Sequence, residues 1–212
     1  MSENTRTISP NKAKKSLTHA MKKKRPVFMW GPPGIGKSDI VAQVTNTFSN
    51  SHLIDIRLSL WDPTDIKGIP YFDSNIGKMV WGAPNELPDE KMAEQYDNIV
   101  LFLDEMNSAP PAVQAAAYQL ILNRRVGQYK LPDNVIIVAA GNREGDKGVT
   151  YRMPAPLANR FVHIELKVEF NDWFDWAVDN KIHKDVVGYM QFSKKDLLLY
   201  LIVHQLDQAY RQ

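Results

Sequence analysis

The stretch at residues 30–39, WGPPGIGKSD, constrains the fold of this chain more than any other part of the sequence. It follows the apolar run PVFMW at residues 26–30, which is typical of a short buried strand. It leads into residues 37–48, KSDIVAQVTNTF, whose apolar residues recur at helical spacing. A buried strand that enters a helix through a glycine-rich turn is a building unit of layered α/β folds.

The turn itself, GPPGIGKS, matches the pattern G-x-x-x-x-G-K-[ST] of a phosphate-binding loop. Backbone N–H groups converge on phosphate oxygens only where the chain curls with positive φ and no side chain intrudes, a need that Gly34 and Gly36 meet. The following helix adds the positive end of its dipole, Lys37 adds a cation for the outer phosphates, and the Ser38 hydroxyl can bind Mg²⁺. A strand-to-helix turn with a coincidental lysine is the alternative. The predicted nucleotide-binding residues are Gly31, Pro32, Pro33, Gly34, Ile35, Gly36, Lys37, Ser38 and Asp39.

Two acidic residues, Asp104 and Glu105, end the apolar run NIVLFLDE at residues 98–105. Ligands of parallel α/β sheets bind at the carboxyl ends of the strands. We therefore predict that Asp104 holds Mg²⁺ through a water molecule beside Ser38, and that Glu105 polarises the attacking water. Such a pair elsewhere marks only the start of a helix, but the upstream phosphate-binding loop favours the catalytic interpretation.

Two further polar residues follow or precede predicted strands. Asn142 ends the run NVIIVAAGN, where its amide could orient the lytic water, although asparagine after glycine is also common in turns. Arg160 follows the short helical segment PLAN and precedes the strand FVHIEL. We predict that Arg160 stabilises the transition state in a neighbouring subunit, an effect worth roughly 10³-fold or more in rate. A solvated or salt-bridged surface arginine is the alternative.

Strand and helix patterns alternate along most of the chain. Further strands are expected at residues 52–58, 98–105, 134–142 and 161–166. This order predicts a P-loop NTPase fold, with a three-layer α/β/α core around a central parallel sheet. From residue 171 onward the pattern is helical, which predicts a short helical C-terminal lid.

We divide the chain into an N-terminal basic helix at residues 1–24, a nucleotide-binding core at 25–168 and a partial helical lid at 169–212. Within the core, the proline- and glycine-rich segment at about residues 61–90 is expected as an insertion that contains a β-hairpin, with GIPYF and KMVW flanking DSNIG. Its loop at residues 67–71 is expected to pack within the hairpin, with contact to a central channel or a partner as the alternative.

The N-terminal helix is expected to begin at Pro10 with Ser9 as its N-cap. Ala13 and Leu17 belong to its apolar side, and lysines occupy the other side. The basic run at residues 22–25 is expected as a solvated helix end, favoured by the negative end of the helix dipole. Contact with phosphate or an acidic partner is the alternative.

The composition of the 212-residue chain excludes several classes of protein. With 26 basic and 24 acidic residues, the net charge of +2 exerts no general attraction on nucleic acid or anionic membranes. Cysteine is absent, so disulfides, thiolate metal sites and cysteine nucleophiles are excluded. The longest apolar run, LLLYLIV, is far shorter than the roughly 20 residues that a membrane-spanning helix needs. No secretory signal is recognisable, and we expect a cytoplasmic protein.

Taken together, these motifs resemble those of the AAA+ ATPases, and within them the MoxR-like, dynein-related (AAA_5) branch. GPPGIGKS is similar to the Walker A motif, VLFLDE to Walker B, AAGN to sensor 1 and PLANRF to the arginine-finger segment. The segment RLSLWDPTDIKGIPYF also resembles the insertion that this branch carries after its second strand. The resemblance covers roughly residues 25–168, in order.

The resemblance implies hydrolysis of ATP with Mg²⁺ in a homo-oligomeric ring, commonly a hexamer, with each site between two subunits. Such proteins remodel other proteins, often with a partner that carries a von Willebrand A domain. By this resemblance Lys37 and Ser38 bind phosphate and Mg²⁺, and Asp104 coordinates Mg²⁺. Glu105 is then the catalytic base, Asn142 the sensor, and Arg160 acts on the next subunit.

The resemblance is weaker in the C-terminal region, where the family has a second sensor arginine. No cation of this region stands in a recognisable P-x-R context; the candidates are Lys181, Lys184, Lys194, Lys195 and Arg211. Three alternatives to a remodelling ATPase stay open: a small-molecule kinase, a nucleic-acid motor or loader, and a nucleotide-gated scaffold with little turnover. Nucleic acid is not favoured, because no aromatic platform accompanies the basic residues.

Overall fold

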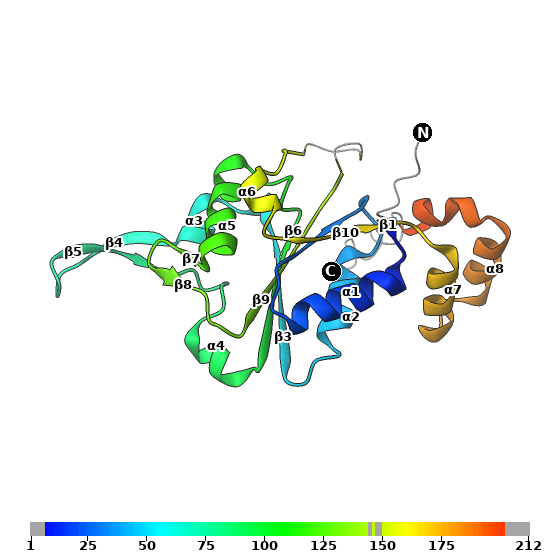
Figure 1. The fold of residues 1–212 in the computed structure, drawn as a ribbon, viewed down its shortest axis with the longest axis horizontal. Coiled ribbons are helices and arrows are strands. Elements are labelled where there is room, and N and C mark those ends of the chain that lie inside the picture. The colour runs from blue at the N-terminus through cyan, green and yellow to red at the C-terminus, as the bar shows by residue number, and fades with distance from the viewer. Residues whose placement is uncertain (1–6, 144–145, 147–149, 202–212) are drawn as a thin grey trace.

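The computed structural model describes residues 7–143, 146 and 150–201, which form a six-stranded sheet between layers of helices (Figure 1). All five pairings in this sheet are parallel, and the strand order is β1-β10-β2-β9-β6-β3. The strands are β1 Thr7–Ile8, β2 Val27–Trp30, β3 Ser51–Arg57, β6 Asn98–Asp104, β9 Val135–Gly141 and β10 Val162–Leu166. The predicted α/β/α fold with a central parallel sheet is confirmed. The short edge strand β1 was not predicted, because two residues carry no periodicity.

The central strands are apolar on both of their faces. Every residue of β9 is buried, and every residue of β6 except Asn98. Consecutive side chains alternate between two cores, as the pleat of a strand requires. In β6, for example, Leu101 and Leu103 contribute to one core, and Val100 and Phe102 to the other.

Helices cover each face of the sheet. Helices α1 (Pro10–Lys22) and α2 (Lys37–Thr45) pack on one face, whereas α5 (Pro111–Asn123) packs on the other. The buried side of α1 consists of the predicted residues Ala13, Leu17, Ala20 and Met21. Ser9 occupies the N-cap position and Pro10 opens the helix, which confirms the prediction, although the Ser9 side chain makes no capping hydrogen bond.

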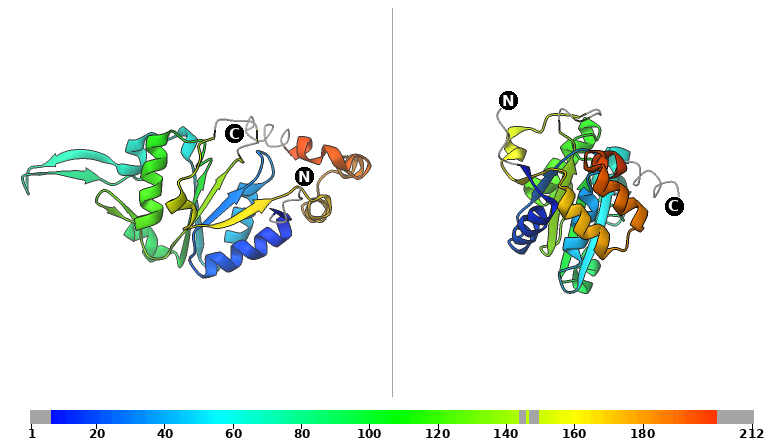
Figure 2. Two further views of the ribbon diagram at one scale, coloured as in Figure 1. Left: turned by 45° about the horizontal axis from the view of Figure 1, so that its top comes forward. Right: turned by 90° about the vertical axis from the view of Figure 1, so that its right-hand side faces the viewer.

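The predicted insertion projects from the body as a two-stranded arm (Figures 1 and 2). Its strands β4 (Ile69–Asp73) and β5 (Lys78–Gly82) are antiparallel. The short helices α3 (Pro63–Lys67) and α4 (Glu90–Gln95) flank this hairpin. The backbone of residues 69–71, in the loop that was expected to pack within the hairpin, pairs with β5 as expected, but the side chains of Ile69 and Tyr71 are exposed. Several large apolar side chains along the hairpin share this exposure. These side chains are Ile69, Tyr71, Phe72, Ile76, Met79 and Trp81.

The C-terminal helices lie at the end of the molecule opposite the hairpin (Figures 1 and 2). Strand β10 leads into α7 (Phe170–Asp179) and α8 (Lys184–Phe192), which share a small core with Leu197. The described helices agree with the expected helical C-terminal segment, whereas Arg211 lies outside the described residues. No helix in the described ranges is both long and apolar enough to cross a membrane.

The remaining elements are short. They are η1 Leu58–Leu60, α6 Ala155–Ala158, η2 Lys194–Asp196 and the pair β7 Arg125–Val126 and β8 Tyr129–Lys130. Helix α6 leads into the segment that contains Arg160.

Candidate functional site

The loop at residues 31–36 joins β2 to α2 at the carboxyl edge of the sheet. Gly34 and Gly36 have φ of 79° and 89°, in the left-handed region that the phosphate-loop prediction required. Gly36 is also the N-cap of α2, so the first N–H groups of this nine-residue helix open onto the loop. Within the predicted binding stretch, Pro33 and Asp39 are exposed, while Ile35 is buried in the core beneath α2.

Lys37 lies buried inside this loop, with 8% of its surface exposed. Its Nζ atom donates hydrogen bonds to the carbonyl oxygens of Gly31 at 2.8 Å and Pro32 at 3.1 Å. It also donates to Oδ1 of Asn142 at 3.2 Å. Burial lowers the pKa of Lys37, and the negative charge of Asp104 opposes this shift. The loop therefore holds its cation against the end of β9.

Ser38 and Asp104, the two predicted magnesium ligands, are in direct contact. The Ser38 hydroxyl donates a hydrogen bond of 3.1 Å to Oδ2 of Asp104. The described residues contain no cluster of three or more histidine, cysteine, aspartate or glutamate side chains that could hold a metal by themselves. One hydroxyl and one carboxylate nevertheless fit Mg²⁺, which is commonly bound by one or two carboxylates together with water and substrate phosphates. We call Lys37, Ser38, Asp104 and Asn142 the polar cluster.

The polar cluster assembles because β2, β9 and β6 are neighbours in the sheet. Lys37 and Ser38 follow β2, Asn142 follows β9, and Asp104 ends β6. The sequence prediction that these strand ends share one edge is thus realised in the fold. The arrangement presents a cation, a hydroxyl, a carboxylate and an amide to one point, as recognition of a metal-bound phosphate requires.

Glu105 lies next to this cluster but is directed toward the end of β3. Its Oε2 accepts a hydrogen bond from the Ser59 hydroxyl, and its Oε1 lies 3.8 Å from Nε of Arg57. Its φ of 53° is unusual for a residue with a side chain, and such conformations gather at functional sites. The sequence analysis did not find Ser59 or Arg57, since nothing in RLSL pairs them with an acid 46 or more residues away.

Arg160 is exposed and lies apart from the polar cluster of its own chain. It precedes β10, whose first residue Val162 is aligned with Val27, the first residue of β2. The phosphate-binding loop follows the opposite end of β2. Figure 1 likewise shows α6 and α7 at opposite ends of β10.

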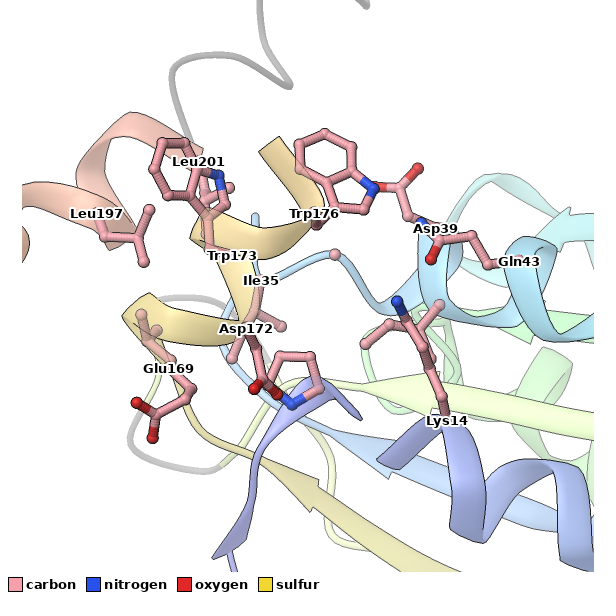
Figure 3. Close-up of a pocket in the computed structure, with 14 residues that line it drawn as sticks. Lys14, Ile35, Asp39, Gln43, Glu169, Asp172, Trp173, Trp176, Leu197 and Leu201 are labelled. Atoms are coloured by element: carbon pink, nitrogen blue, oxygen red, sulfur yellow. The ribbon is translucent and has the colours of Figure 1, made fainter. Parts of the chain in front are cut away.

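An apolar pocket that the sequence analysis missed adjoins the loop (Figure 3). We define it by Ile35, Trp173, Trp176, Leu197 and Leu201, with Lys14 and Asp39 at its polar side. In Figure 3 the indole of Trp176 extends toward Asp39, and Trp173 lies beside Leu197. No local motif marks this pocket, because it forms only when α7 folds back beside the loop.

Comparison with known families finds one match that covers most of the chain. The sequence profile of the ATPase family associated with various cellular activities (AAA) matches residues 27–168. This interval contains the phosphate-binding loop, the polar cluster, Glu105 and Arg160.

Individual relatives are more distant. Midasin of Giardia intestinalis is 24% identical over an alignment of 200 residues that covers 85% of this chain and 4% of midasin. The proteasome-associated ATPase of Pseudarthrobacter chlorophenolicus is 24% identical over an alignment of 198 residues that covers 84% of this chain and 31% of that protein. A crystal structure of a proposed ATPase from Cytophaga hutchinsonii has a TM-score of 0.58 at 18% identity, covering 84% of this chain and 53% of that one. This chain thus spans only part of the length of each relative, and the structural likeness shows the fold.

Proposed function

The chain belongs to the ATPase family associated with various cellular activities (AAA), and we propose from this premise that it binds and hydrolyses ATP with Mg²⁺. One observation carries the proposal. The ends of three neighbouring strands bring Lys37, Ser38, Asp104 and Asn142 together beside a loop with the curvature of a phosphate seat. Family membership alone would not show that these four side chains lie together in one site.

The residues take different parts in this reaction. Lys37 leaves the loop carbonyls for the outer phosphates, and Ser38 and Asp104 hold the ion. Bound Mg²⁺ neutralises charge on the phosphate oxygens. Glu105 polarises the attacking water through its carboxylate, which also accepts a hydrogen bond from Ser59 at Oε2. Asn142, already against Lys37, orients the water toward the outermost phosphate.

The apolar pocket is proposed as the seat of the adenine base. It adjoins Gly36 and Asp39 at the start of α2, which places it next to the phosphate seat. Its walls combine two indoles with aliphatic side chains, a composition suited to the flat apolar faces of a base. Trp176 is only partly buried and is therefore accessible to a ligand.

We further propose a homo-oligomeric ring, commonly a hexamer in the family, in which Arg160 completes the site of the next subunit. The separation of Arg160 from its own polar cluster supports this arrangement. We also propose that the chain belongs to the MoxR-like branch and acts in the cytoplasm. There it would remodel a partner protein that carries a von Willebrand A domain, as partners of this branch often do. The exposed apolar side chains of the β4–β5 hairpin support contact with another protein.

A second candidate function is a nucleotide-gated scaffold with little turnover. The contacts of Glu105 with Ser59 and Arg57 favour it, because they occupy the proposed base. Both candidates bind ATP. They differ in whether phosphate is released.

A complementation assay tests hydrolysis and the shared site together. Glu105→Gln should bind ATP without turnover, and Arg160→Ala should also be inactive. A mixture of the two should regain phosphate release, because a Glu105→Gln subunit can supply Arg160 to a neighbour with an intact Glu105. Undiminished hydrolysis by Glu105→Gln would exclude the proposed base. Inactive mixtures that still assemble would exclude sharing of Arg160, and binding without turnover in the unmodified protein would identify the scaffold.

A further inference from the structure

We propose that Asn107 is a positioning residue for hydrolysis, because its side-chain amide fixes Asn142 against Lys37. The inference rests on the proposed function and adds a residue to it. Asn107 lies three positions beyond Asp104, in the turn between β6 and α5, and only 3% of it is exposed. A buried amide needs hydrogen-bond partners for both of its polar groups, and these partners show which residue Asn107 holds in place.

Both partners of this amide belong to Asn142. Nδ2 of Asn107 donates to the carbonyl oxygen of Asn142 at 2.7 Å. Oδ1 of Asn107 accepts from the backbone N–H of Asn142 at 3.1 Å. Asn142 follows β9 directly, so the Asn107 side chain bonds its backbone in the way that the neighbouring strands bond the backbone of β9. An amide carries a donor and an acceptor side by side on one rigid plane, as this double contact with the N–H and the carbonyl of one residue requires.

The backbone on either side of the Asn107 side chain is also fixed by hydrogen bonds. The N–H of Met106 donates to the carbonyl oxygen of Ala140 at 2.9 Å, and the Asn107 carbonyl accepts from the N–H of Tyr151 at 2.8 Å. Gly141 permits the close approach, because a Cβ atom there would lie 2.2 Å from Oδ1 of Asn107. The turn after Glu105 is therefore coupled rigidly to the end of β9.

This coupling has a specific consequence for nucleotides. The Asn142 side chain contacts Lys37, the cation assigned to the outer phosphates, so its position matters most when the outermost phosphate is present. Without Asn107, Asn142 should lose its fixed position, and a displacement of about 1 Å can cost roughly 100-fold in rate. Binding of ADP, which lacks that phosphate, should change little.

The test compares Asn107→Ala with a matched control, Asn134→Ala. Asn134 also hydrogen bonds to the backbone through its side-chain amide, which donates to the carbonyls of Ala93 at 2.9 Å and Tyr96 at 2.6 Å, but it lies away from the site. We expect Asn107→Ala to lower kcat about 10- to 100-fold. The affinity for a non-hydrolysable ATP analogue, measured by calorimetry, should fall relative to that for ADP. Asn134→Ala should lower only the melting temperature.

Two further variants separate positioning from folding. Asn107→Asp keeps the acceptor but loses the donor, so it should reproduce the change in the ATP-analogue-to-ADP ratio even if Asn107→Ala does not fold. In an Asn142→Ala background, Asn107→Ala should have no additional effect on kcat if Asn107 acts through Asn142. Three results would overturn the inference. They are an unchanged kcat and an unchanged ratio of ATP-analogue to ADP affinity in both Asn107 variants, additive effects on kcat in the double variant, or a loss of kcat in Asn134→Ala as large as that in Asn107→Ala. If the unmodified protein binds no nucleotide, both the proposed function and the role of Asn107 are wrong. If the unmodified protein hydrolyses ATP and the Asn107 variants match its kcat and affinity ratio, only the role of Asn107 is wrong.

Discussion

The polar cluster is held by hydrogen bonds between side chains that follow three neighbouring strands, whereas the apolar pocket beside it is formed by packing. The cluster lies within the sheet edge and is tied to buried strands. The pocket instead depends on Trp176 and its neighbours from α7, which belong to a separate small core. The two halves of the site should therefore respond differently to mutation. Changes in the cluster should affect phosphate recognition and turnover, and changes in the pocket should affect all adenine nucleotides alike.

Lys37→Ala should have the largest effect and gives the strongest test of this comparison. Truncating one partner of a buried, hydrogen-bonded charge typically costs 2–5 kcal/mol, so we expect ATP affinity to fall about 100-fold or more. Calorimetry with ATP and ADP, in Mg²⁺, measures the loss. Lys24→Ala is the control, because Lys24 also donates to a backbone carbonyl, that of Asp133 at 3.1 Å, but lies outside the site. Unchanged nucleotide affinity in Lys37→Ala would mean that the cluster does not bind phosphate.

Trp176→Ala should have an intermediate effect of a different kind. Stacking of a base on an aromatic side chain is worth roughly 1–3 kcal/mol, so affinities for ATP and ADP should fall together by about tenfold. The rate at saturating ATP should stay close to that of the unmodified protein. Phe192→Ala removes an aromatic side chain that is 90% exposed on α8 and should change neither value. A loss confined to ATP would contradict the division between the two halves.

The same contrast explains which parts of the site the sequence predicts. A phosphate seat and a magnesium ligand demand particular residue types at fixed spacing, so Lys37, Ser38 and Asp104 stand out after their strands. The apolar pocket makes no such demand, because Trp173 and Trp176 fit equally well as ordinary core residues of an amphipathic helix. The contacts of Asn107 and Ser59 escape prediction for another reason. Their partners, Asn142 and Glu105, are brought near only by the strand order.

Parts of the fold show the same limit. The apolar runs predict the buried strands, and the turn residues predict the hairpin. The sequence does not predict that the side chains of the hairpin are exposed, because Tyr71 and Phe72 favour strands whether or not another surface covers them. Its backbone closure is specific, however. A Cβ atom at Gly68 would lie 1.8 Å from the carbonyl oxygen of Gly82, so this pair admits no larger residue at position 68.

Ser59→Ala should have the smallest effect, and the direction of that effect tests whether the contact with Ser59 hinders or supports Glu105 as the proposed base. The Ser59 hydroxyl donates to Glu105 and so competes with the attacking water for the same carboxylate. Removing it should raise kcat about two- to threefold without changing the KM for ATP. This gain corresponds to the lower end, about 0.5 kcal/mol, of the net contribution of a hydrogen bond, because Ser59 contacts only one carboxylate oxygen and Arg57 remains 3.8 Å from the other. Ser51→Ala is the matched control at the other end of β3, where the hydroxyl donates to Thr45 and Phe48. A fall in kcat would reverse the interpretation, because Ser59 would then hold Glu105 in its working position.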